Sequence, residues 1–134
     1  MSRDRREART RTMLLRRTFQ GMFTLGVVSI VVFSVSPFPL LYGSLCVSDK
    51  IEHAVAYAIV ALFGALGFPG RRHQASIAAA LVGLGVVLEL VQLAVPGRMC
   101  DPADALANTA GVLAGLLAGK ALSLALPAAL ALND

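Results

Sequence analysis

The residues best suited to chemistry in this sequence lie in three short polar stretches, separated by long apolar runs. They are Asp49, Lys50, His53, Glu89, Gln92, Arg98, Asp101, Asp104 and Asn108. Carboxylates and an imidazole are the usual side chains of acid–base catalysis and of metal binding. Arginine and lysine recognise phosphate and carboxylate groups. The elements that carry these side chains therefore decide which chemistry they can share.

The apolar runs are typical of a membrane protein. Hydrophobic residues make up 57% of the 134 residues, and only 15% are charged. A soluble domain usually carries about 25% charged residues. Several runs approach the roughly 20 residues that cross a bilayer as a helix. We therefore predict an all-α integral membrane protein, a bundle of four spanning helices.

Turn residues and charges place the boundaries of the spans. The four spans are expected at residues 18–41, 51–68, 75–95 and 103–126. Pro37 and Pro39 should end or kink the first of them. The chain then divides into a basic N-terminal segment (1–17), a four-span membrane domain (18–126) and a C-terminal tail (127–134).

Basic residues predict the orientation of the bundle. Residues 1–17 hold seven arginines, and the link between the second and third spans holds Arg71 and Arg72. Cytoplasmic links carry an excess of Lys and Arg, so we expect both termini in the cytoplasm. Anionic lipid headgroups are the expected partners of the basic segment. A basic run can also bind nucleic acid, but its position directly before a span argues against that partner.

In this topology the three polar stretches meet at the outward-facing end. His53 lies at the start of the second span, Glu89 near the end of the third, and Asp104 at the start of the fourth. An ionisable residue inside the bilayer costs about 2.5–3.5 kcal/mol on insertion scales, so it needs a partner, water or a function. We predict a polar pocket built by these three spans. Simpler roles remain open, because aspartate also caps helices and asparagine also links them.

Small residues predict where the helices approach closely. They are Gly64, Gly111, Gly115 and Gly119. The last three recur at intervals of four along the fourth span. They continue the helical face of Asp104 and Asn108, so this face is expected to point into the bundle.

Cys46 and Cys100 are the only cysteines, and both fall in outward links. A disulfide between them is a hypothesis that an oxidising compartment would permit.

Two of the stretches resemble the motifs of VanZ-like membrane proteins. "DKIEHAVAYAIVALFG" is similar to the opening motif, and "ELVQLAVPGRMCDPADALANTAGVLAG" is similar to the second. The resemblance covers about residues 30 to 120, and Ala54 departs from it where an aromatic residue is expected. It implies a small multi-span protein of the bacterial cytoplasmic membrane. The founding member contributes to resistance against the glycopeptide teicoplanin, but a shared fold does not carry that function to this chain.

The sequence leaves three roles open, of which an accessory role at the cell envelope is favoured. In this role Lys50 and Arg98 would meet the anionic groups of a lipid-linked or wall-directed ligand. Another role is that of a structural subunit, in which the polar residues only fix the register of the helices.

The second role is a membrane-surface enzyme acting on a lipid headgroup or phosphate ester. His53 or Glu89 would be its acid or base, Asp101 and Asp104 would hold a divalent metal, and Arg98 would stabilise charge. Outside this alternative no cofactor is predicted, and whether the protein is an enzyme stays open.

Overall fold

The protein is a bundle of four α-helices. The computed structural model describes residues 3–36, 49–96 and 101–125. The helices are α1 (Arg3–Val35), α2 (Asp49–Gly67), α3 (Arg71–Gln92) and α4 (Pro102–Ala125). Each is long and apolar enough to cross a membrane. The predicted all-α four-helix membrane bundle is therefore confirmed.

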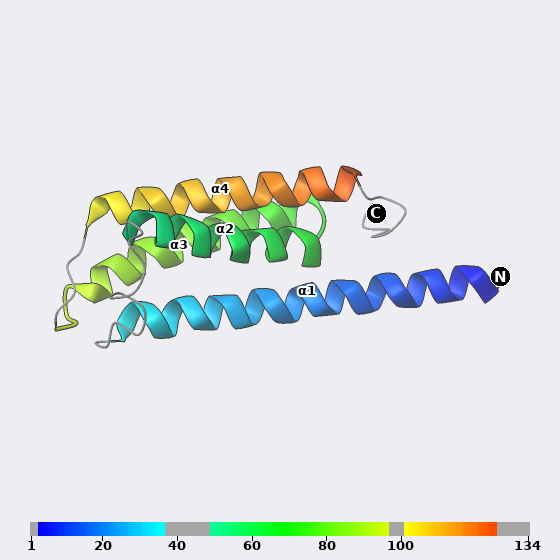
Figure 1. The fold of residues 1–134 in the computed structure, drawn as a ribbon, viewed down its shortest axis with the longest axis horizontal. Helices are drawn as coiled ribbons and strands as arrows, with labels where there is room; N and C mark the ends of the chain where they lie inside the picture. Colours follow the sequence, from blue (N-terminus) through cyan, green and yellow to red (C-terminus); the bar gives the residue numbers. More distant parts are fainter. Residues whose placement is uncertain (1–2, 37–48, 97–100, 126–134) are drawn as a thin grey trace.

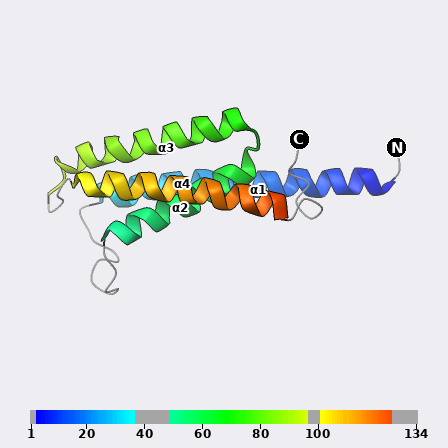
Figure 2. The ribbon, with the colours of Figure 1, turned by 90° about the horizontal axis from the view of Figure 1, so that it is seen from above.

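Consecutive helices run in opposite directions, so one end of the bundle collects the end of α1, the start of α2, the end of α3 and the start of α4 (Figure 1). We call this the polar end. The helices α2 and α3 lie between α4 and α1 (Figures 1 and 2). Both α2 and α3 pack against each of the other three helices, and the most extensive contact is that of α2 with α4. Polar residues of different spans can therefore meet along α2 and α3.

The outer surface of the bundle is apolar. Large side chains such as Leu106 and Leu117 are about 70% exposed (72% and 68%). In lipid this exposure has no hydrophobic cost, and a helix satisfies its own backbone hydrogen bonds there. The interior is narrow, and its fully buried side chains in the described residues include Leu81 and Val112. Contacts between helix backbones must therefore contribute much of the packing.

Proline and glycine set two of the helix boundaries. The first helix ends at Val35, two residues before Pro37, and proline disfavours helical geometry in the residue that precedes it. Between α2 and α3 the chain turns at Gly70, whose φ of 103° is a conformation that side chains rarely adopt. The link between these helices is thus short, and it holds α2 and α3 as neighbours.

The closest helix contact is that of α4 with α2. A Cβ atom added at Gly111 would overlap the carbonyl oxygen of Ala54, and one added at Gly115 would overlap that of Ala58. One added at Gly119 would lie 2.5 Å from the Cβ of Ala65. Hydrogen in place of a side chain lets the two backbones touch. The contact at Gly111 is with the Ala54 backbone, so it does not explain why position 54 lacks the aromatic residue of the VanZ-like pattern.

The glycine at position 64 serves a different contact. A Cβ there would lie 3.0 Å from the Phe23 ring of α1 and 3.2 Å from Ile77 of α3. Gly64 therefore lies where α2 meets both α1 and α3. Together the two sets of glycines place α2 at the centre of the bundle.

Candidate functional site at the polar end

Buried polar side chains gather at one end of the bundle. In the described part of the chain they are Glu89, Gln92, Asp104 and Asn108, each between 2% and 4% exposed. Two come from the end of α3 and two from the start of α4. Buried polar groups need hydrogen-bond partners. The contacts of this end therefore show what each side chain does.

A lysine joins α2 to α4. Its Nζ lies 2.5 Å from Oδ2 of Asp101 and 3.1 Å from Oδ1 of Asp104. The side chains of Lys50 and Asp101 are each 46% exposed, whereas that of Asp104 is only 5% exposed. Lys50 thus pairs with the exposed carboxylate of Asp101 and also reaches the buried carboxylate of Asp104.

Asp101 also caps α4. Its Oδ1 accepts a hydrogen bond of 2.9 Å from the backbone N–H of Ala103, and its carbonyl oxygen accepts one of 2.8 Å from that of Asp104. Pro102 follows at the first helical position, where a missing N–H costs nothing. The Lys50 ammonium and the Ala103 N–H hold the pKa of Asp101 below its usual range. Capping and ion pairing are therefore combined in one carboxylate.

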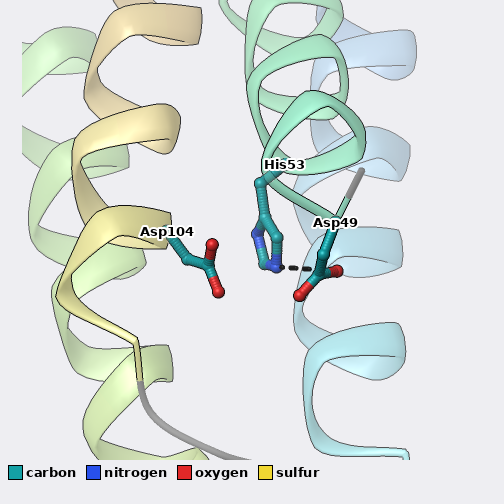
Figure 3. Close-up of side chains that lie close together, drawn as sticks. All are labelled: Asp49, His53 and Asp104. Carbon is teal, nitrogen blue, oxygen red and sulfur yellow. Dashed lines mark ion pairs between the residues drawn. The ribbon is translucent and has the colours of Figure 1, made fainter. Parts of the chain in front are cut away.

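The imidazole of His53 bridges α2 and α4. Its Nδ1 lies 3.2 Å from Oδ1 of Asn108, and its Nε2 lies 3.7 Å from Oδ1 of Asp49, one turn earlier on α2. Figure 3 shows the ring between the carboxylates of Asp49 and Asp104, with Nε2 turned toward Asp49. The exposed fraction is 43% for Asp49 and 14% for His53. The ring therefore lies just inside the surface.

The two polar residues of α3 make different connections. Oε2 of Glu89 accepts a hydrogen bond of 3.3 Å from the backbone N–H of Asp101, which ties α3 to the start of α4. Nε2 of Gln92 donates one of 3.3 Å to the carbonyl oxygen of Ser34 on α1. Glu89 thus belongs to the polar group around α4, whereas Gln92 anchors the neighbouring helix.

The family model of VanZ/LLP1 proteins matches residues 4–123 of this chain. The chain belongs to the VanZ/LLP1 family. The match covers nearly all of the four helices and every polar residue described above. No curated protein and no solved structure is significantly similar to the chain. The geometry of the polar end is therefore the main guide to what this VanZ/LLP1 protein does.

Three predicted site residues of the VanZ/LLP1 protein lie outside the described residues. They are Arg98, Cys46 and Cys100. The cation at position 98 and the disulfide hypothesis stay predictions.

The structure also adds a residue that sequence reasoning left out of the site. Tyr57 is 2% exposed and follows His53 by one helical turn. A Cβ at Gly85 would lie 3.3 Å from the Tyr57 hydroxyl and 3.1 Å from Nδ2 of Asn108. Tyr57 and Asn108 therefore both reach Gly85 of α3. The spacing of four between His53 and Tyr57 was the available signal, but an aromatic residue in a span is ordinarily lipid-facing or core.

Three side chains of metal-ligand type lie close together at the polar end. One ligand atom from each of Asp49, His53 and Asp104 falls within 4.8 Å of the others. Asp101, which the enzyme alternative places beside Asp104 at a metal, contacts Lys50 and caps α4. A cation bound here would be held by α2 and α4 together.

Proposed function

We propose that this VanZ/LLP1 protein has an accessory role at the bacterial cell envelope, in which the polar end binds, or alters access to, a lipid-linked or wall-directed ligand. The polar end would face the extracytoplasmic side. Arg71 and Arg72 begin α3 at the opposite end, where the α1 arginines also lie. An excess of basic residues marks the cytoplasmic side.

One observation carries the proposal: exposure falls in steps from the surface into the bundle. The side chains of Lys50 and Asp101 are each 46% exposed, that of His53 is 14% exposed and that of Asp104 is 5% exposed. A network that only fixes helix register needs no such gradient, because its members can all be enclosed. Ligand sites hold a few convergent polar groups that are open to solvent, and these side chains reach from the surface to the interior.

The charges at this end indicate how a ligand would be held. The Lys50 ammonium is already paired with Asp101 and Asp104. An anionic ligand would therefore have to compete with two carboxylates for Lys50, or rely on Arg98. The carboxylates of this end could also accept hydrogen bonds from the amine or hydroxyl groups of a ligand.

Single substitutions test the proposal. Glu89→Gln, Arg98→Ala and Asp104→Asn would each be assayed for folded yield in membranes and for susceptibility to envelope-directed antibiotics. We expect yields near wild type with altered susceptibility. Arg72→Ala, at the opposite end, is the matched control and should change neither. Loss of yield in all three variants would instead support a purely structural network, and unchanged susceptibility at normal yield would refute the envelope role.

A further inference from the structure

The side chains of Asp49, His53 and Asp104 form a compact set of metal-ligand types. Their ligand atoms lie within 4.8 Å of one another, and they come from facing helices, two from α2 and one from α4 (Figure 3). The Asp49–His53 spacing of four places both residues on one side of α2. The three side chains thus lie at the α2–α4 contact, where the glycines of α4 let the two helices approach closely.

The orientation of His53 favours a cation at its Nε2. The Nδ1 atom faces Oδ1 of Asn108 at 3.2 Å, an arrangement in which the Nδ1–H donates and the amide oxygen accepts. The lone pair of a neutral ring is then on Nε2, which faces the Asp49 carboxylate at 3.7 Å. That distance is too long for a hydrogen bond. The separation fits either an ion pair with a protonated ring or a cation held between the two atoms.

The Nδ1 contact is itself typical of ligating histidines. Such residues almost always donate their other ring N–H to an oxygen acceptor, which fixes the tautomer and the ring orientation. Asn108 fills this role from a position that is 2% exposed. It is therefore a positioning residue for His53.

Lys50 does not exclude a cation here. Its Nζ contacts Oδ1 of Asp104, and a carboxylate has a second oxygen that can bind an ion. The stronger contact of Lys50 is with Asp101, at 2.5 Å. Lys50 would then donate a hydrogen bond to Asp104 while the other oxygen of this carboxylate binds the ion.

The donor set is compatible with zinc. One imidazole nitrogen and two carboxylate oxygens suit zinc, which binds such atoms at about 2.0–2.2 Å in a tetrahedral arrangement. Ligand atoms of that site lie roughly 3.4 Å apart, so side-chain rotations that shorten the present separations would complete it. Three protein ligands leave a fourth position for water or for an oxygen of a ligand. The 43% exposure of Asp49 puts that position on the aqueous side.

We propose that Asp49, His53 and Asp104 bind a zinc ion at the polar end. This goes beyond the envelope role and does not rest on it, because binding is measured on the purified protein.

The test uses the full chain purified in detergent and stripped of metal with a chelator. Zinc is titrated against a chromophoric competitor, and the thermal unfolding midpoint is measured with and without zinc. We expect one zinc per chain and a midpoint raised by zinc. His53→Ala should abolish both effects, and Asn108→Leu should weaken binding about 10- to 100-fold. His73→Ala is the matched control, because His73 is the other histidine of the chain and bonds only its local Pro69 carbonyl in the described contacts.

Cobalt provides a second, spectroscopic readout. In the wild-type protein we expect the intense visible absorption of four-coordinate Co²⁺, displaced by zinc. Absence of saturable zinc binding, or equal binding by wild type and a folded His53→Ala variant, would overturn the proposal. Loss of cobalt absorption in His73→Ala but not in His53→Ala would do the same. An envelope phenotype without zinc binding would leave the proposed function standing and refute only the metal site.

Discussion

The contact between α2 and α4 has two halves of opposite chemistry. Toward the polar end, Asp104 and Asn108 reach Lys50 and His53 through charged and polar groups. Further along the same stripe of α4, glycine lies directly against the α2 backbone. The glycine half of the contact therefore sets the distance between α2 and α4, and the contacts of the polar half depend on that distance.

A substitution in the glycine half of the α2–α4 contact should lower the stability of the protein most. In Gly115→Ala the new methyl group would overlap the Ala58 carbonyl and lie 2.9 Å from the Cβ of Ala61. The helices must separate, and we expect a loss of about 1–3 kcal/mol in the free energy of unfolding. Thermal unfolding in detergent measures it.

Gly83→Ala on α3 is the matched control for that substitution. A Cβ at Gly83 meets nothing within 4 Å, so the change should be neutral or stabilise the helix by about 0.5–1 kcal/mol. If Gly115→Ala were as mild as Gly83→Ala, the glycine half would not set the helix distance. If it also weakened zinc binding, the dependence of the polar half on the glycine half would be demonstrated directly.

The polar half should give an intermediate effect, graded by burial. Asp104→Asn keeps the volume but removes the buried charge that meets Lys50, and we expect a loss of about 1–2 kcal/mol in stability. Asp101→Asn should cost less, because that side chain is 46% exposed and asparagine also caps helices well. Chemical or thermal unfolding of the two variants side by side measures the difference. Equal losses would contradict the assignment of Asp104 as the interior partner.

The smallest expected effect is a pH dependence at the mouth of the polar end. Because Lys50 and the Ala103 N–H lower the pKa of Asp101 in the folded protein, this group stabilises the fold above its unfolded pKa of about 3.9. The contribution is lost as the pH falls through the lower folded pKa. The unfolding midpoints of wild type and Asp101→Asn, measured from pH 6 to pH 3, should therefore converge. Curves that stay parallel would show that the charge of Asp101 does not contribute to stability, and would contradict the lowered pKa.

Much of the fold was accessible from the sequence, because lipid leaves few choices. Apolar runs of spanning length and their proline and glycine boundaries predict four helices, and the described helices agree. The stripe from Asp104 to Gly119 also predicts which face of α4 points inward, since its polar and small residues share one helical period.

The pairing within the polar end could not be predicted in the same way. Periodicity places Gln92 beside Glu89 on α3, but it cannot show that Gln92 reaches the Ser34 carbonyl on α1. Backbone acceptors carry no sequence signal. Nor could spacing show that Lys50 joins Asp101 to Asp104, because that contact depends on how closely two helices approach in space.

The continuous first helix has a consequence for its arginines. At 1.5 Å per residue its 33 residues span about 50 Å, which exceeds the roughly 30 Å hydrocarbon core. Counting back from Val35, that thickness is used up near Arg16, and Arg6 lies about 15 Å further along the axis. The surface field of the lipids decays over about 8 Å in physiological salt. If α1 crosses the bilayer upright, we therefore expect the arginines near Arg16 to contact anionic headgroups and those near Arg6 to lie in the aqueous phase.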